Sequence, residues 1–331
     1  MAGNESKLGI LGVGAYVPER VMTNDDWAEL IDTSDEWITA RTGIKNRRFA
    51  ADDESTVDFA VAAAREALDA AGVAPGEIDE IIVATDTPEV YTPDTAAFVQ
   101  HALGARQVPA YDLAGSGCAG FVQALDIACS RVRWGRDKVL VIGVELITRL
   151  MDWTDRNTCV LFGDAAGAAV IGEVDGAGEI LAVEAGTDGS RTDILMLEVG
   201  GTRKPFSREL ARQRRHKGVM MNGREVFKEA VARMSEASLK VLQRAGRDLQ
   251  SVALVIPHQA NLRIIQAVAK VLGTPLERVF TNVQDYGNTG SASVPLALTQ
   301  ALGEGRILPG DLVLLTTFGA GFHWAAALVQ F

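Results

Sequence analysis

The sequence predicts an α/β protein with helices and sheets in alternating layers, built from two halves of similar design. Helix-like and strand-like segments alternate along the chain, and they do so in the same order in both halves. Apolar runs such as 81–84 and 312–315 are typical of strands that are covered on both faces. Two sheets with helices between and outside them would bury all of these strands, so we expect an αβαβα arrangement.

The clearest internal repeat pairs residues 64–85, AREALDAAGVAPGEIDEIIVAT, with residues 238–258, SLKVLQRAGRDLQSVALVIPH. Each reads as an amphipathic helix, an Ala-Gly stop, a loop and a buried strand. Chance similarity between βα units is the alternative, but further matches follow in the same order and favour duplication. They pair 108–120 with 279–294 (a strand, then a Gly-rich turn), 138–145 with 311–317, and 166–172 with 324–329.

The turn at residues 173–178 is rich in glycine and acidic residues, and we expect the boundary between the halves there. The halves are then residues 1–175 and 176–331. A chain of 331 residues with 47% hydrophobic and 23% charged residues has a globular composition and room for two such units.

The net charge of −11 disfavours non-specific binding of nucleic acid, and no nucleic-acid-binding motif is present. A polyanionic ligand would need a local basic patch. Residues 1–7 lack the basic and then apolar plan of a signal peptide, and no apolar run is long enough to span a membrane. The sequence therefore predicts a cytoplasmic protein that binds neither nucleic acid nor a membrane.

Three cysteines, Cys118, Cys129 and Cys159, lack the spacing of a metal site, which indicates free thiols in a reducing compartment. Cys129 and Cys159 read as small buried apolar residues. Cys118 differs, because it follows the Gly-rich stretch 112–117 and precedes a helical run at 121–133. Such a turn presents a side chain in a cleft, and a helix N-terminus lowers the pKa of a thiol there. We expect Cys118 to be a nucleophile.

His258 follows a buried strand at 252–256 that Pro257 ends, and Asn288 lies in a Gly-Asn-Thr-Gly turn. A histidine at the exit of a buried strand faces the crevice where α/β proteins bind ligands. Alone, such a histidine is structural as often as functional, and such a turn is most often only a turn. With Cys118 they would form a nucleophile and two hydrogen-bonding groups. His101 and His216 read as structural or solvated, and His323 has no assigned role.

Short motifs over nearly the whole chain resemble the β-ketoacyl-ACP synthase III family of the thiolase superfamily. The PHQAN and RTGI segments are highly specific as a pair. The motifs are the Cys118 turn, PHQANLRII at 257–265, GNT at 287–289, DEWI at 35–38, RTGI at 41–44, Arg47-Arg48, Asp155-Arg156, FGDAAGAA at 162–169 and FGAGF at 318–322.

The resemblance implies a thiolase-like fold, with the nucleophilic cysteine in the first half and the histidine and asparagine in the second. It also implies a homodimeric acyltransferase that begins type II fatty acid synthesis. Cys118 would take the acyl group of an acyl-CoA, and His258 and Asn288 would donate to the thioester carbonyl of malonyl-ACP as CO₂ leaves. Backbone N–H groups of Cys118 and Ala320 would form the oxyanion hole. The products are 3-oxoacyl-ACP, CoA and CO₂, and no metal or redox cofactor is required.

Substrate-binding residues are implied by the same resemblance. Those for CoA are Trp37 at the adenine, Arg41 and Arg156 at the nucleotide end, Phe227 in the pantetheine tunnel, and Ala260 and Asn261. Those for the acidic carrier protein are Lys228, Arg263 and Lys270. Thr92 would lie where a partner subunit closes the primer pocket, and its small size would admit longer or branched primers. A basic stretch, 203–217, is either a charged loop or an attraction for a polyanionic donor.

Some features distinguish this chain from its relatives. Thiolases use a second cysteine near the C-terminus, and none follows Cys159 here. Elongating synthases have histidine where this chain has Asn288. The 112–118 stretch is one residue longer than the family pattern, Ala320 stands where glycine is frequent, and His323 replaces a usual threonine. The alternatives are a synthase-like acyltransferase or condensing enzyme of specialised, polyketide-type metabolism, and a non-catalytic binding protein with a decayed site.

Overall fold

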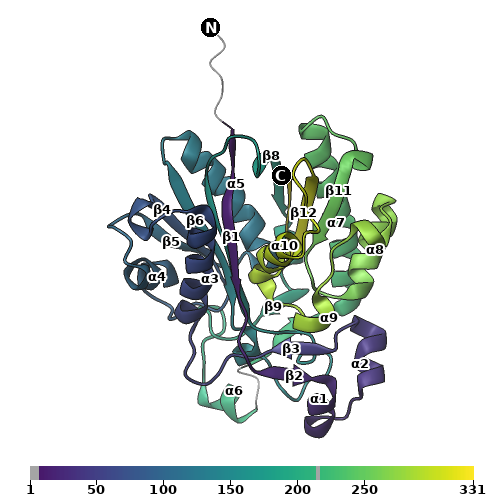
Figure 1. The fold of residues 1–331 in the computed structure, drawn as a ribbon. Coiled ribbons are helices and arrows are strands. Elements are labelled where there is room, and N and C mark those ends of the chain that lie inside the picture. Colours follow the sequence, from purple (N-terminus) through teal and green to yellow (C-terminus); the bar gives the residue numbers. More distant parts are fainter. Residues whose placement is uncertain (1–6, 214–216) are drawn as a thin grey trace.

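The computed structural model describes residues 7–213 and 217–331, which form a layered α/β molecule (Figure 1). Its nine-stranded sheet has the order β11-β12-β13-β8-β1-β7-β6-β4-β5. The strands of the first half are β1 (Leu8–Tyr16), β4 (Glu80–Ala84), β5 (Ala110–Leu113), β6 (Lys138–Glu145) and β7 (Ala165–Glu173), and those of the second are β8 (Glu179–Thr187), β11 (Val252–Pro257), β12 (Leu312–Gly319) and β13 (His323–Gln330).

The two halves of the sheet repeat one pattern of strand directions. In the first, β4 and β6 are parallel, and β7 and β1 follow antiparallel. In the second, β11 and β12 are parallel, and β13 and β8 follow antiparallel. The duplication read from the sequence is therefore present in the topology. Where two separate sheets were expected, however, a single residue pair between β1 and β8, Gly9 with Glu179, joins them into one.

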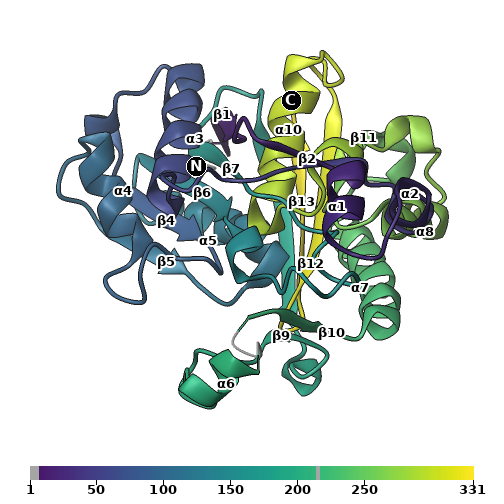
Figure 2. The same ribbon diagram turned by 90° about the horizontal axis from the view of Figure 1, so that it is seen from below.

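The helices form three layers around this sheet (Figures 1 and 2). Two of them lie between the halves and contact strands of both: α5 (Gly120–Arg133) and α10 (Ser293–Gly303). Outside the first half lie α3 (Thr56–Ala71) and α4 (Thr95–Leu103), and outside the second lie α7 (Gly223–Arg244) and α8 (Leu262–Leu272). The expected αβαβα layering is confirmed, and it buries both faces of the central strands.

Smaller elements are inserted between these layers. They are β2 (Val21–Thr23), α1 (Asn24–Leu30), α2 (Asp35–Thr42), β3 (Asn46–Arg48), β9 (Leu195–Leu197), α6 (Arg208–Arg212), β10 (Val219–Met221) and α9 (Val283–Tyr286), with short 3₁₀ turns between them. In Figure 1, α1, α2, α6, β2 and β3 gather at the lower end of the molecule.

Local sequence explains how α3 forms and packs. Ser55 accepts from the backbone N–H of Asp58 while the Asp58 carboxylate accepts from that of Ser55, which satisfies two free donors at the helix start. The helix ends at Gly72, whose φ of +63° suits a residue without Cβ. A Cβ at Gly14 of β1 would lie 2.4 Å from the backbone nitrogen of Ala67, so glycine in the strand and alanine in the helix permit this close layer contact.

The expected strand at the start of segment 279–294 is absent. Only an isolated bridge between Val255 and Val279 remains, followed by a hydrogen bond from the Phe280 N–H to the carbonyl of Val255. The Gln259 side chain ends the pairing, because its Oε1 accepts from the N–H groups of Asn282 and Val283 at 2.9 and 3.2 Å. The chain then turns into α9 and toward Asn288.

Candidate active site

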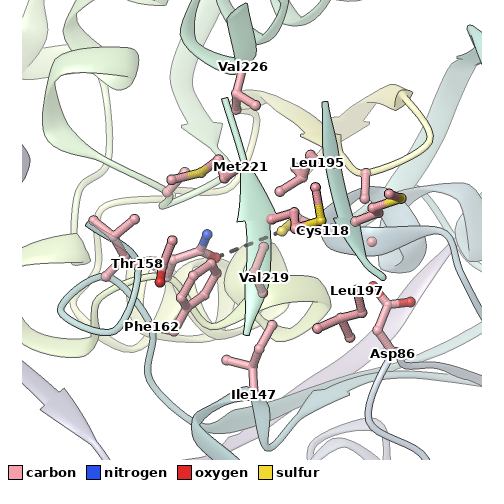
Figure 3. A pocket seen from close by; sticks show the side chains of 18 of the residues that line it. Asp86, Cys118, Ile147, Thr158, Phe162, Leu195, Leu197, Val219, Met221 and Val226 are labelled. Atoms are coloured by element: carbon pink, nitrogen blue, oxygen red, sulfur yellow. Dashed lines mark hydrogen bonds between the residues drawn. The ribbon is translucent and has the colours of Figure 1, made fainter. Parts of the chain in front are cut away.

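One cavity of about 1450 Å³ is lined by residues from both halves of the chain, including Cys118, His258 and Asn288. Their positions follow from the repeat: Cys118 precedes α5, Asn288 lies shortly before α10, and His258 follows β11. The Sγ of Cys118 lies 3.9 Å from Oδ1 of Asn288 (dashed line in Figure 3). The structure thus brings together the three side chains that the sequence singled out.

A short 3₁₀ turn, Gly117–Ala119, carries Cys118 directly into α5. Two glycines in the stretch before Cys118 have left-handed backbone, Gly115 at φ +75° and Gly117 at φ +54°. The hydroxyl of Thr317 on β12 donates to the carbonyl of Cys118 at 2.6 Å. Both halves of the protein therefore hold the residue that carries the thiol.

The expected lowering of the Cys118 pKa is wrong for this structure. Burial raises the pKa of the thiol, and the carboxylates of Glu145 and Asp86 raise it further, while the hydrogen bond with Asn288 acts in the opposite direction. The helix N-terminus does not compensate for desolvation and two nearby acidic groups. The resting residue is a thiol, and acylation requires the loss of its proton.

His258 is buried, and burial lowers its pKa to about 3. Its backbone N–H donates to the carbonyl of Thr316 at 2.8 Å, which ties the end of β11 to β12. Among the described residues, Nδ1 has no hydrogen-bond partner. The imidazole is therefore neutral near pH 7 and carries one N–H, which suits a hydrogen-bond donor and not a cation.

Asn288 is held by its own backbone and by its side-chain oxygen. Its N–H donates to the carbonyl of Leu161 at 2.8 Å, and its carbonyl accepts from Gly163 at 3.1 Å. Oδ1 accepts from the N–H of Gly290 at 2.9 Å. Because the oxygen is occupied by this bond, the amide NH₂ is the group left to donate into the cavity.

Two backbone segments meet beside the thiol. A Cβ built on Gly319 would lie 2.5 Å from the backbone nitrogen of Cys118, and one on Gly117 would lie 2.7 Å from that of Ala320. The N–H groups of Cys118 and Ala320 thus belong to closely packed segments at the cavity. An oxyanion hole needs two such donors aimed at one oxygen, and this role of Cys118 and Ala320 stays a prediction.

The cavity also reaches the residues expected to hold CoA: Trp37, Arg41, Arg156, Phe227, Ala260 and Asn261 all line it. The guanidinium carbons of Arg41 and Arg156 lie 4.3 and 5.2 Å from the Trp37 ring centre. Asn261 begins α8 by accepting from the N–H of Arg263 at 2.8 Å, and its amide donates to the carbonyl of Arg41 at 3.2 Å. Arg263 lines the cavity as well.

Other expected residues lie elsewhere. Thr92, Lys228 and Lys270 are exposed and are not among the residues that line the cavity. Tyr91 and Asp94, which lie near Thr92 in the sequence, do line the cavity. In the basic stretch 203–217, Arg203 lines the cavity and Lys204 pairs with Glu198 at 2.5 Å, whereas Arg214, Arg215 and His216 lie outside the described residues.

Sequence reasoning missed one apolar wall of the cavity. It comes from the paired strands β9 and β10 together with Ile147, Phe162 and Val226 (Figure 3). From the two strands it includes Leu195, Leu197, Val219 and Met221. Each strand has only three residues, which is too short for a periodic pattern to be recognised. A wall of this kind suits the hydrocarbon part of an acyl group.

Two of the remaining histidines, His101 and His323, are outside the cavity lining. His323 Nδ1 lies 2.8 Å from the hydroxyl of Thr187, and burial lowers the pKa of this imidazole while Asp86 raises it. His101 is exposed on α4. Within residues 7–213 and 217–331, no cluster of acidic, histidine or cysteine side chains has the make-up of a metal site. No helix in the same ranges is long and apolar enough to cross a membrane.

Comparison with known proteins identifies the family of this chain. Models of the family 3-oxoacyl-[acyl-carrier-protein] synthase III match residues 111–189, and models of its C-terminal part match residues 242–331. β-Ketoacyl-[acyl-carrier-protein] synthase III of Symbiobacterium thermophilum is 49% identical over 324 residues, with 98% of each chain covered. That of Roseiflexus castenholzii is 48% identical over 322 residues, with 97% of each covered.

A solved structure extends the comparison to the fold. The 3-oxoacyl-[acyl-carrier-protein] synthase III of Aquifex aeolicus has a TM-score of 0.89 and 45% identity, and the match covers 98% of this chain and 100% of that one. Its thiolase-like fold agrees with the layers described above. The chain belongs to the β-ketoacyl-[acyl-carrier-protein] synthase III family.

Proposed function

We propose that Cys118, His258 and Asn288 carry the chemistry of this chain, which by its family is an acyl-transferring condensing enzyme that initiates fatty acid synthesis. The supporting observation is their shared cavity, with the thiol 3.9 Å from the Asn288 amide oxygen. The substrates are an acyl-CoA primer and malonyl-ACP, and the products are 3-oxoacyl-ACP, CoA and CO₂.

In the first half-reaction, the Cys118 thiol loses its proton and its sulfur attacks the thioester carbonyl of acyl-CoA. The tetrahedral oxyanion accepts from the backbone N–H groups of Cys118 and Ala320. Such a donor typically lowers the barrier by roughly 3 kcal/mol. When the intermediate collapses, the C–S bond to CoA breaks, CoA leaves as its thiol, and the acyl group remains on Cys118.

In the second half-reaction, malonyl-ACP enters and its thioester carbonyl accepts hydrogen bonds from His258 and Asn288. The C–C bond to the carboxylate breaks, CO₂ leaves, and the electron pair forms an enolate whose oxygen these donors stabilise. The enolate carbon attacks the acyl carbonyl, and the Cys118 thiolate is the leaving group. A neutral imidazole suits this role because it donates without having to titrate.

Binding of the substrates involves the residues at the cavity mouth. Trp37 stacks on the adenine, Arg41 and Arg156 pair with the phosphates, and Phe227, Ala260 and Asn261 contact the rest of CoA. Among the cations proposed for the carrier protein, Arg263 lines the cavity, while Lys228 and Lys270 are exposed on α7 and α8. Such exposed cations fit a docking surface for an acidic protein.

The proposed enzyme works as a homodimer in the cytoplasm. Thr92 then lies beside the primer pocket that a second subunit closes, next to the cavity-lining Tyr91. The chemistry consists of thioester exchange and decarboxylation stabilised by hydrogen bonds, so we propose that it uses no metal or redox cofactor. Sedimentation that gives a stable monomer would overturn the dimer.

The test combines a covalent and a product readout. Incubation with acyl-CoA should add one acyl mass to Cys118, and addition of radiolabelled malonyl-ACP should then release CO₂ and form 3-oxoacyl-ACP. The Cys118→Ser variant should give no adduct, whereas Cys129→Ala, which changes another buried thiol, should be acylated like the wild type. An adduct without condensation would favour a plain acyltransferase, and no adduct on the wild type would favour a binding protein.

A further inference from the structure

A pair of carboxylates, Asp86 and Glu145, lies beside the turn that presents Cys118. Asp86 follows β4, lines the cavity, and accepts from the N–H of Gly115 at 2.9 Å. The N–H of Gly117 is a second backbone donor to the same carboxylate. These are the two glycines with left-handed backbone in the turn before Cys118.

Glu145, at the end of β6, is buried, and its carboxyl group contacts the backbone of Asp86. Its two carboxyl oxygens lie 3.1 and 3.3 Å from the backbone N–H of Asp86, and Oε2 accepts from the hydroxyl of Thr87 at 2.9 Å. The Glu145 contacts therefore fix the backbone from which the Asp86 side chain reaches the turn.

The hydrogen bonds indicate which of the two carboxyl groups holds a proton. The Ser291 hydroxyl lies 2.8 Å from the carbonyl of Ala84 and 3.0 Å from Oε1 of Glu145. One hydroxyl proton satisfies one of these oxygens, so the second contact is satisfied when Glu145 supplies a proton. Burial and the charge of Asp86 raise the pKa of Glu145 well above its ordinary value, in agreement with this.

Asp86, unlike Glu145, faces hydrogen-bond donors that stabilise a negative charge. Burial raises the pKa of Asp86, while two backbone N–H groups and the nearby His323 act in the opposite direction and favour its charged form. The titratable groups that face it are Glu145 on β6, His323 on β13 and the Cys118 thiol. With the proton on Glu145, one negative charge remains on Asp86, where two donors stabilise it.

We propose that Asp86 is a positioning residue for the nucleophile, whose side-chain oxygen accepts from the Gly115–Gly117 turn and so sets the place of the Cys118 sulfur and backbone N–H. Its action passes through the turn, and it makes no contact with the acyl group. The arrangement has a second consequence: the same negative charge keeps the thiol protonated until substrate enters. The proposal rests on the role of Cys118 as nucleophile.

The test measures two rates on each variant: acylation of Cys118 by acyl-CoA, followed by mass spectrometry, and alkylation by iodoacetamide as a function of pH. Asp86→Ala removes both the acceptor and the charge, and we expect acylation to slow roughly 10- to 100-fold because the sulfur is displaced. Asp86→Asn keeps an acceptor for Gly115 and removes the charge, so it should lose much less. In both variants the pH at which the alkylation rate is half-maximal (the alkylation midpoint) should fall by roughly half a unit to one unit.

The Asp126→Asn variant is a matched control, because Asp126 is exposed on α5 and lies outside the cavity lining. It should change neither rate nor midpoint. Wild-type acylation rates in Asp86→Ala, or equal losses in folded Asp86→Ala and Asp86→Asn, would overturn the positioning role. An unchanged alkylation midpoint in Asp86→Asn would overturn the assignment of the charge, even if Asp86→Ala failed to fold. If the wild type itself were not acylated, the proposed function would fail, and alkylation would still decide the role of Asp86.

Discussion

Asn288 Oδ1 lies 3.9 Å from Cys118 Sγ, although 170 residues separate the two in the chain. The duplicated fold explains this distance. Each residue lies just ahead of a helix of the central layer, Cys118 before α5 and Asn288 before α10, and both helices contact strands of both halves. The proposed nucleophile thus comes from one half, and the groups proposed to stabilise the enolate come from the other.

The separate origin of these groups predicts separate effects on the two half-reactions. His258→Ala and Asn288→Ala each remove a donor to the enolate oxygen, so CO₂ release from malonyl-ACP should fall roughly 100-fold. Acylation of Cys118 should fall less than tenfold, because backbone N–H groups stabilise that oxyanion. Labelled CO₂ and acyl-enzyme mass measure the two steps. His101→Ala, on the exposed face of α4, is the control, and equal losses in both steps would contradict the division.

The pKa shifts predict different pH dependences for the two steps. Burial and the negative charge of Asp86 raise the Cys118 pKa, so the reactive thiolate forms only as pH rises, and alkylation by iodoacetamide should increase through the alkaline range. Burial lowers the His258 pKa to about 3, so the imidazole stays neutral above that value. CO₂ release with pre-acylated enzyme should be flat from about pH 5 to 8. A Cys118 midpoint below the ordinary thiol range would refute the first expectation.

The sequence predicted the site better than its surroundings. Gly- and Pro-marked turns identify Cys118, His258 and Asn288 because a side chain at a strand or helix end needs special backbone there. The charges around Cys118 were not predictable, since Asp86 and Glu145 approach it only through strand packing. The strand expected near Val279 fails for a similar reason: a side-chain oxygen of Gln259 takes the backbone donors that would have extended the pairing.

The close approach of Gly319 to the nucleophile predicts that a methyl group there is harmful. A Cβ would lie 2.5 Å from the Cys118 nitrogen, and the contact is backbone, so the two segments must separate. Gly319→Ala should therefore slow acylation and condensation together, each by roughly 100-fold, since in both steps the carbonyl oxygen of the acyl group under attack gains negative charge beside the proposed backbone N–H donors. Gly303→Ala is the matched control, because nothing lies within 4 Å of its Cβ position. Wild-type turnover in Gly319→Ala would remove the backbone N–H of Cys118 from the mechanism.

Replacing Trp37 should weaken the binding of acyl-CoA without slowing the chemical steps. Its ring centre lies 4.3 and 5.2 Å from two guanidinium carbons and the residue lines the cavity, but it belongs to α2, far in sequence from Cys118. Loss of a stacking partner costs roughly 1–3 kcal/mol. Trp37→Ala should therefore raise KM for acyl-CoA about tenfold and leave kcat nearly unchanged, as steady-state kinetics would measure. Trp134 is 88% exposed, and Trp134→Ala should change neither constant.

Arg47 links the stability of the fold to the place of Asn288. It is fully buried, its Nε and Nη2 donate to the carbonyl of Val160 at 2.8 and 2.6 Å, and Nη1 donates to Oδ1 of Asn24 at 2.6 Å. The next residue, Leu161, accepts from the N–H of Asn288. Removing the guanidinium leaves two buried oxygens without these donors and loosens the segment that holds the catalytic amide.

We therefore expect Arg47→Ala to lower the free energy of unfolding by roughly 3 kcal/mol, at about 1 kcal/mol for each lost hydrogen bond. Denaturant titration measures this, and Arg247→Ala, an exposed guanidinium, should change it by less than about 0.5 kcal/mol. Arg47→Met fills the space but donates no hydrogen bond. If it lowers the free energy of unfolding as much as Arg47→Ala does, the loss is due to hydrogen bonding; if the wild-type value is recovered, the loss in Arg47→Ala is due to packing. Leu161 accepts the hydrogen bond from the backbone of Asn288. In the folded fraction of either variant, CO₂ release should therefore fall further below the wild-type rate than acylation of Cys118 does.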